Sequence, residues 1–149
     1  MRLKTLGLIV AIGLGTLSAS PASGAEQARR PYRVGVLHQA YFPNIPTVEG
    51  LTAGLKAMGL EEGRDVTFDI RFTRGNLDAT PAAAAALATA GPDVIVVDSE
   101  VGTHAVKAAT QAIPVVFTAV GDPVAAGLVA SVAHPGGNVT GVSSLLCVA

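Results

Sequence analysis

The chain has 149 residues, of which 50% are hydrophobic, 14% are charged and 4% are aromatic, and its net charge is −1. This composition is typical of one compact globular domain and excludes a disordered or collagen-like chain. The ten lysines and arginines form no basic block, which argues against nucleic acid as a partner. The single cysteine, Cys147, excludes an intrachain disulfide and a cysteine-based zinc site.

The first 25 residues have the three-part pattern of a secretory signal peptide. Arg2 and Lys4 precede an apolar run of 12 residues, Leu6–Leu17, and small and polar residues follow it. A helix that spans a bilayer needs about 20 residues, so a retained membrane anchor is the weaker alternative. We expect cleavage after Ala25, which leaves residues 26–149 as an exported domain, periplasmic or secreted, without a direct membrane span.

Short apolar runs after the signal predict strands. Most of these runs lack polar and apolar alternation, as expected for strands that are covered on both faces. The run Asp65–Phe72 does alternate, which predicts an edge strand with one wet side. The expected strands are Tyr32–Leu37, Asp65–Phe72, Asp93–Asp98, Pro114–Val120 and Val139–Val142.

Helix-forming segments separate the expected strands. Thr80 and Asp122 each precede a proline, which is the pattern of a helix N-cap followed by proline at the first helical position. The alanine run after Thr80 favours a helix because alanine has the highest helix propensity. The expected helices are Pro46–Met58, Pro81–Ala90, Gly102–Gln111 and Val124–Val132.

Strands joined by helices of this length predict right-handed crossovers and a parallel sheet with helices on both faces, a doubly wound α/β fold. Ligands of such sheets bind beyond the carboxyl ends of the strands. Three segments are therefore candidates for a binding site: His38–Ile45, Ser99–Thr103 and Gly121–Pro123.

Several sequence blocks carry a resemblance to a known family. They are Val34–Leu37, Gly54–Val66, Ile113–Phe117 and, most specifically, Gly121–Ser131 and Pro135–Ser143. Through these blocks the chain resembles the ABC-transporter solute-binding proteins of the type I periplasmic-binding fold, in the branch whose better-understood members carry aromatic amino acids. The resemblance runs from about Arg33 to Leu145, which corresponds to less than half of the family's usual length.

The resemblance implies a Rossmann-like N-terminal lobe at residues 26–149, truncated before the second lobe that would close over the ligand. It further implies the exported substrate-binding component of an ABC import system, with a small solute such as an amino acid as ligand and an ABC permease in the membrane as partner. A receptor-type sensory ligand-binding domain is the alternative function.

The resemblance also points to individual ligand-binding residues. Tyr41 and Phe42 follow the first strand, where they either stack on a planar or apolar solute or pack over the sheet edge. Ser99 and Glu100 follow the third strand, where the family often holds a carboxylate; Glu100 favours an amine or a polyol instead, because it would repel a carboxylate. Asp122 is expected to cap a helix or to accept from the ligand, and the two roles are compatible.

The residues give little support for metal binding or catalysis. His38, His104 and His134 lie far apart on different elements, so we expect no metal site and no cofactor. The segment Gly141–Leu145 lacks the closing glycine of a nucleophile elbow. A binding protein is therefore preferred to an enzyme, although doubly wound folds do host many chemistries.

Overall fold

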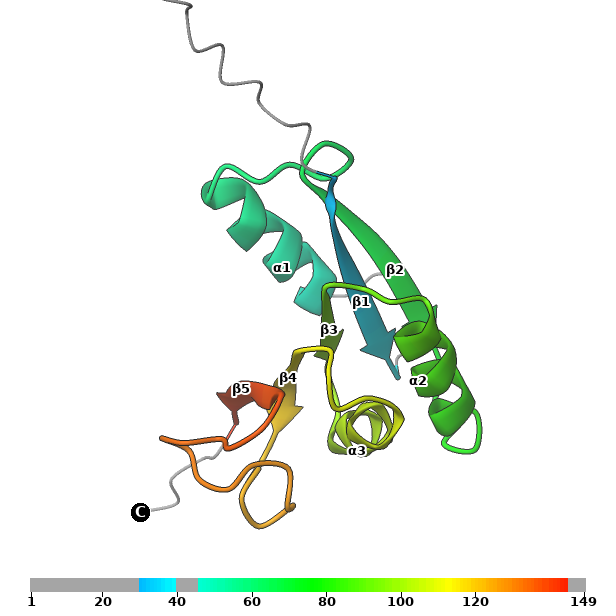
Figure 1. Ribbon diagram of the computed structural model, residues 1–149, viewed down its shortest axis with the longest axis vertical. Helices are drawn as coiled ribbons and strands as arrows, with labels where there is room; N and C mark the ends of the chain where they lie inside the picture. Colours follow the sequence, from blue (N-terminus) through cyan, green and yellow to red (C-terminus); the bar gives the residue numbers. More distant parts are fainter. Residues whose placement is uncertain (1–29, 40–45, 145–149) are drawn as a thin grey trace, which may run out of the picture.

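The computed structural model describes residues 30–39 and 46–144, and these residues form a parallel five-stranded sheet in the order β2-β1-β3-β4-β5 (Figure 1). Three helices of the described ranges connect the first four strands. The α/β parallel-sheet prediction is therefore confirmed. The strands are β1 (Tyr32–His38), β2 (Val66–Phe72), β3 (Val94–Val97), β4 (Val115–Val120) and β5 (Val139–Ser143), and the helices are α1 (Pro46–Ala57), α2 (Thr80–Thr89) and α3 (Glu100–Ala109).

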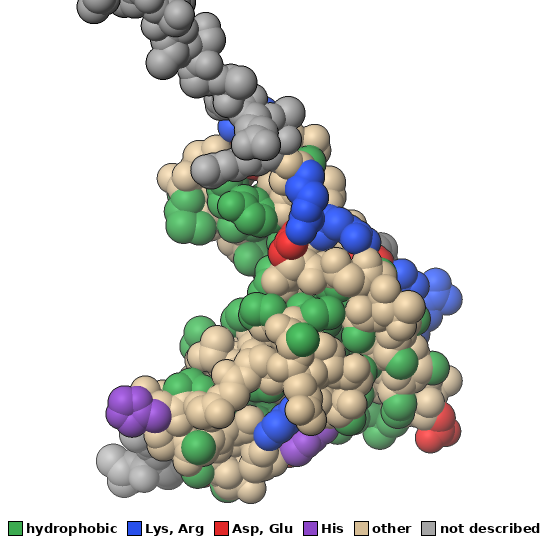
Figure 2. All heavy atoms as spheres, viewed as in Figure 1, with side chains coloured by type: hydrophobic (Ala, Val, Ile, Leu, Met, Phe, Trp, Pro, Cys, Tyr) green, Lys and Arg blue, Asp and Glu red, His purple; other side chains and the backbone are tan. Residues whose placement is uncertain are grey.

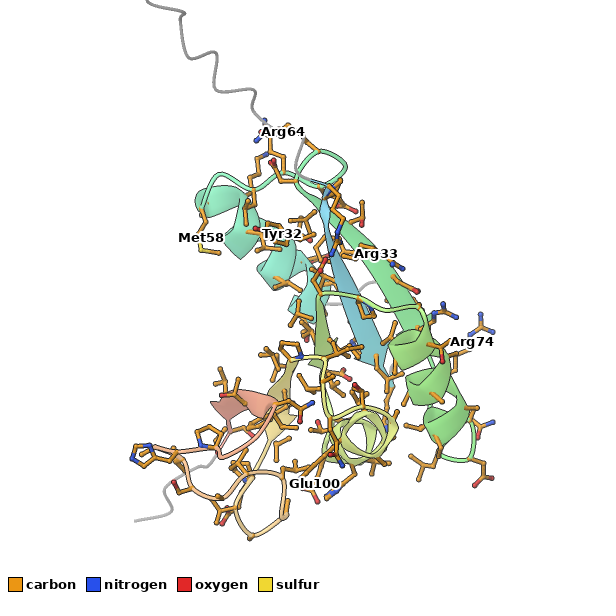
Figure 3. All side chains as sticks on the ribbon, in the orientation of Figure 1. Tyr32, Arg33, Met58, Arg64, Arg74 and Glu100 are labelled. Carbon is orange, nitrogen blue, oxygen red and sulfur yellow. The ribbon has the colours of Figure 1, made fainter. Side chains whose placement is uncertain are left out.

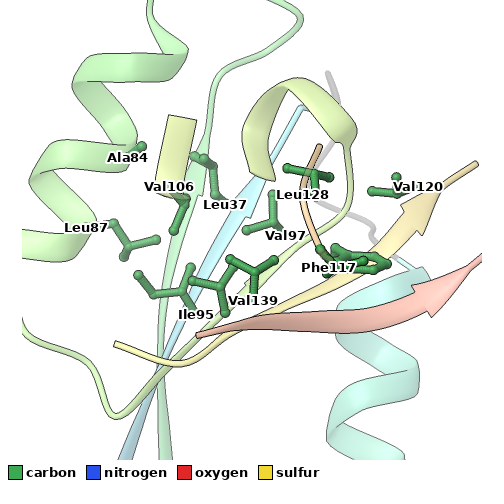
Figure 4. Packing of buried hydrophobic residues seen from close by; sticks show 12 residues of the cluster. Leu37, Ala84, Leu87, Ile95, Val97, Val106, Phe117, Val120, Leu128 and Val139 are labelled. Carbon is green, nitrogen blue, oxygen red and sulfur yellow. The ribbon is translucent and has the colours of Figure 1, made fainter. Parts of the chain in front are cut away.

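The helices cover both faces of the sheet. Because side chains alternate along a strand, Val34 and Val36 of β1 face α1, whereas Leu37 faces α2 and α3. The cluster on the α2 and α3 face is the larger one, and most of its side chains are almost completely buried (Figure 4). Its members include Leu37, Leu87, Ile95, Val97, Val106, Val115, Phe117, Val120 and Leu128.

The edge-strand prediction for residues 65–72 is confirmed. β2 pairs with β1 along its whole length and forms one edge of the described sheet. Phe68 and Ile70 pack on the α1 side, whereas Asp69 and Arg71 form an ion pair at 2.7 Å on the alternate positions. Charged side chains on an edge strand oppose unwanted pairing with other strands.

The structure corrects the predicted cap of the second helix. The N-cap of α2 is Ala79, and it makes no side-chain cap hydrogen bond. Thr80 is instead completely buried, and its hydroxyl donates to the backbone oxygen of Asn76 at 3.2 Å. The side chain of Asn76 accepts from the Ala79 N–H at 3.1 Å, so it closes the turn that leads into α2.

The predicted helix Val124–Val132 is wrong, because this segment consists of turns. The carboxylate of Asp122 accepts from the N–H groups of Val124 and Ala125, each at 3.0 Å, and thereby starts a helical turn. Gly127 then adopts a φ of 68°, in the left-handed region, which ends the turn. The buried Leu128 joins the core of the α2 and α3 face instead of continuing a helix.

The connections reverse direction between β1 and β3. From β1 the chain crosses by α1 on one face to the outer strand β2, and it returns by α2 on the other face to β3. The reversal produces a switch point, and in sheets of this kind the ligand crevice lies at the carboxyl ends of such strands. No helix within residues 30–39 and 46–144 is long and apolar enough to cross a membrane.

Candidate functional site

The candidate site lies at the edge of the sheet where the strands have their carboxyl ends. Parallel strands all end at the same edge, so the segments after β1, β3 and β4 lie near one another. Glu100, at the start of α3, lies at the opposite end of the molecule from Arg64 and Met58, which flank the amino-terminal edge (Figure 3).

Ser99 and Glu100 form the start of α3. The Ser99 hydroxyl oxygen accepts from the N–H of Gly102 at 3.1 Å, so Ser99 is the helix N-cap and α3 begins two residues earlier than predicted. The side chain of Glu100 is exposed in the first helical turn, where the helix dipole favours a negative charge. A cap that uses the serine lone pair still leaves its hydroxyl proton available to a ligand.

Gly102 is needed for this arrangement because the start of α3 lies against β3. A Cβ atom at this position would lie 2.7 Å from the Ser99 hydroxyl oxygen and 2.8 Å from a methyl carbon of Val97. Both distances are shorter than a carbon atom tolerates, so only glycine lets Ser99 turn back to cap the helix.

Asp122 follows β4 and is exposed. Its carboxylate is engaged by the two backbone N–H groups described above, so the capping geometry is present, although it caps a single turn and not a helix. The neighbouring Gly121 oxygen accepts from the Ser143 hydroxyl of β5 at 2.5 Å, which ties the ends of β4 and β5 together. Tyr41 and Phe42 lie outside the described residues and remain sequence predictions.

The structure adds a buried pair that the sequence analysis did not identify. His38, at the end of β1, lies with its Nδ1 atom 2.7 Å from an oxygen of Asp98, directly after β3. The two side chains are only 10% and 14% exposed. The sequence analysis considered His38 as a metal ligand and as the first residue of a candidate binding segment, and it considered Asp98 only as the end of a strand. The available signal was that two apolar strands each end in a polar residue. The sequence did not show that these two strands are neighbours in the sheet.

Burial dominates the electrostatics of Asp98. It raises the pKa of the Asp98 carboxyl, and the nearby charge of His38 opposes this increase only in part. The imidazole also has an aromatic neighbour, because the His38 ring stacks on Phe72 with ring centres 6.2 Å apart. A carboxyl whose pKa is raised by burial is a feature that many functional sites share.

Unsatisfied polar atoms accompany the pair. The buried atoms without a hydrogen-bond partner in the described part of the chain are Gln39 Nε2, Thr73 Oγ1, Asp98 Oδ1 and Thr118 Oγ1. Gln39, Thr73 and Asp98 directly follow β1, β2 and β3. Buried polar groups are normally paired with protein atoms or with water, so these atoms mark the carboxyl edge of the sheet as polar.

The histidines do not converge on a metal site. Across residues 30–39 and 46–144, no group of three or more His, Cys, Asp or Glu side chains is arranged to hold an ion. His104 is exposed on α3 and His134 is exposed in the turn before β5.

Comparison with known proteins identifies a family for this fold and site. Residues 36–149 match the family described as ABC transporter substrate binding protein. A curated relative, the tyrosine-binding protein of Clostridioides difficile strain R20291, is 29% identical over an alignment of 160 residues. The alignment covers 97% of this chain and 46% of the relative. The chain thus spans about half the length of this relative.

Solved structures support the same assignment. A conserved domain protein from Vibrio cholerae is 39% identical with a TM-score of 0.70, over 76% of this chain and 39% of that one. A ligand-free, open substrate-binding protein with adhesive properties from Clostridium difficile is 30% identical with a TM-score of 0.72, over 78% and 40%. An ABC domain from Streptococcus pneumoniae in complex with L-Trp is 29% identical with a TM-score of 0.68, over 76% and 38%.

The family match covers well over half of the chain, and the solved relatives share its fold and are described as substrate-binding or ligand-bound proteins. The chain therefore belongs to the family of ABC transporter substrate-binding proteins.

Proposed function

We propose that this chain supplies a solute-contacting surface of an exported, non-catalytic binding protein that delivers its solute to an ABC permease for import. The observation that carries this proposal is the group of polar side chains at the carboxyl ends of β1, β3 and β4, at the switch point of the sheet. Export is supported by the signal pattern of residues 1–25, which is typical of proteins directed to the periplasm or outside the cell.

The proposed solute is an amino acid. Glu100 is exposed at the edge and provides a partner for the solute ammonium group, while the Ser99 hydroxyl donates to an oxygen of the solute. Asp122 provides a second carboxylate beside the same edge. Tyr41 and Phe42 are proposed to stack on an aromatic side chain of the solute. Relatives named for tyrosine binding and crystallised with L-Trp support this solute class.

The affinity of this chain by itself is expected to be weak. Hinged binding proteins hold the solute between two surfaces and exclude water when they close. The described domain offers one such surface, and a solute that keeps part of its hydration gains less free energy from each contact. We therefore expect binding of L-tryptophan to be weaker than micromolar.

Nuclear magnetic resonance titration of the full chain with L-tryptophan tests this proposal, because chemical shifts report weak binding residue by residue. Saturable shifts are expected at the amides of Ser99, Glu100 and Asp122, and none with glucose. The variant Glu100→Gln removes the charge that faces the ammonium group and should weaken binding about fivefold. Glu62→Gln, an exposed acid in the turn before β2, is the matched control. Shifts confined to other surfaces, or equal shifts with glucose, would contradict the proposal.

A further inference from the structure

A cavity of about 320 Å³ lies between α1 and the sheet, on the face opposite α2 and α3. Six of its eight lining side chains are valine or leucine, and they include Leu51 and Leu55 of α1, Val96 of β3 and Val116 of β4. Ligand pockets of proteins are concave, mainly apolar and about 300–1,000 Å³ in volume, and a few polar groups orient the ligand. The cavity has the size and the apolar lining of such a pocket.

α1 packs loosely over this cavity. In the described chain none of its residues is buried, although Leu51 and Leu55 direct apolar side chains at the sheet. On β4, Val116 and Thr118 alternate with side chains of the cluster on the other face, so they point toward the α1 side, and both are only half-buried. Because protein interiors are normally close-packed, a ligand in the cavity would add contacts to α1 and to the sheet without displacing a side chain.

The end of the cavity toward the carboxyl edge of the sheet is polar. The hydroxyl oxygen of Thr118, a lining residue, is buried and has no hydrogen-bond partner among the described residues. When the pairing of β3 with β4 is continued by one residue, Asp98 lies beside Thr118, and its Oδ1 atom is likewise buried without a partner there. A carboxylate oxygen only accepts hydrogen bonds, whereas a hydroxyl both donates and accepts. An N–H or O–H group therefore complements this end.

We propose that the cavity is a second binding site, which takes a small, neutral and mainly apolar molecule with one N–H or O–H group. In an engineered protein, an apolar cavity of about 150 Å³ holds benzene, so about 320 Å³ is enough for two fused rings. The lining has no charged side chain, which favours a neutral molecule because a charge would lose its hydration. The N–H or O–H group donates to the Thr118 hydroxyl oxygen, and the rings contact the aliphatic side chains.

This site is separate from the proposed solute site. Ser99 and Glu100 begin α3, and α3 packs on the opposite face of the sheet from the cavity. The inference therefore does not depend on the proposed function, and either can fail without the other.

Titration of the full chain with indole tests the proposal, because indole has two fused rings and one N–H group. Saturable chemical shifts are expected at Leu51, Leu55, Val96 and Val116, with a dissociation constant of about 1 mM or below. Val116→Phe, which extends a ring into the cavity, should weaken binding about fivefold or more. Val132→Phe is the matched control, since Val132 is exposed in the turn before β5 and lies outside the lining.

A second variant isolates the hydroxyl. Thr118→Val keeps the shape of the side chain, so it should lower the affinity for indole about fivefold through the loss of one hydrogen bond. It should not lower the affinity for indene, which has the same shape as indole without the N–H group. Thr140→Val, on the same face of the neighbouring β5 but outside the lining, is the matched control and should leave both affinities unchanged.

The inference is overturned if indole gives no saturable shifts up to its solubility limit, or if the shifts lie on other surfaces. It is also overturned if Val116→Phe and Val132→Phe bind indole equally, or if Thr118→Val loses indole and indene affinity to the same extent, since that would be a change in packing. If dilution of the wild type alone shifts the lining residues, a second copy of the chain fills the cavity and the proposed ligand class is wrong.

Discussion

The contribution of Asp98 to stability should depend on pH with a sign opposite to that of an ion-paired surface carboxylate such as Asp93. Burial raises its pKa in the folded chain, so the folded state holds this proton more tightly than the unfolded state does. The stabilising contribution is complete below the ordinary aspartate pKa and is lost as pH rises through the raised one. The stability of the wild type relative to Asp98→Asn should therefore decrease with pH across that window, as urea denaturation at a series of pH values will measure.

Asp93 provides the contrasting case. Its carboxylate accepts hydrogen bonds from Arg30 and from the Arg33 N–H, and these bonds lower its pKa. Its contribution is present above the ordinary aspartate pKa and is lost as pH falls through the lowered one, so Asp93→Asn should show the opposite slope. Equal slopes for the two variants would mean that the burial of Asp98 has no energetic effect.

Close packing at the start of α3 makes Gly102 sensitive to a single methyl group. Gly102→Ala would place a carbon against Ser99 and the buried Val97, which should destabilise the fold by about 1–3 kcal/mol despite the better helix propensity of alanine. Gly50 of α1 is the matched control, because nothing lies near its Cβ position and Gly50→Ala should stabilise the helix by about 1 kcal/mol. Urea denaturation of both variants measures the difference. A stabilised Gly102→Ala chain would refute this account of the helix start.

Local sequence patterns predicted most elements but not their neighbours in space. Uninterrupted apolar runs predicted the bounds of β1, β3 and β4 to within one or two residues, because a short, continuous apolar run is typical of a strand that is buried on both faces. The helix predicted after Asp122 failed because the cap and proline pattern describes only the first turn, which Gly127 ends. The buried pair was missed for a similar reason: that β1 lies beside β3 depends on the crossovers of α1 and α2, which no local pattern encodes.

The two faces of the sheet differ at the scale of the whole molecule. α2 and α3 pack over a large buried cluster, whereas α1 is the one helix of the described residues that covers the other face. A cavity of about 320 Å³ lies between α1 and the sheet, lined by apolar side chains that include Leu51, Leu55, Val96 and Val116. The molecule is indented between α1 and the β4 and β5 end, and hydrophobic side chains lie along this hollow (Figure 2).

This asymmetry predicts self-association through β5. The strand pairs with β4 and forms the second edge of the described sheet, and its Val142 side chain is 67% exposed. Edge strands with exposed apolar side chains pair readily with other chains, and a single lysine opposes such pairing because its charge would have to be desolvated. Sedimentation velocity should therefore show concentration-dependent association of the wild type that Val142→Lys reduces. Val132→Lys is the matched control, since Val132 is 72% exposed but lies in the turn before β5. A concentration-independent monomer, or equal effects of both lysines, would show that association does not proceed through this edge.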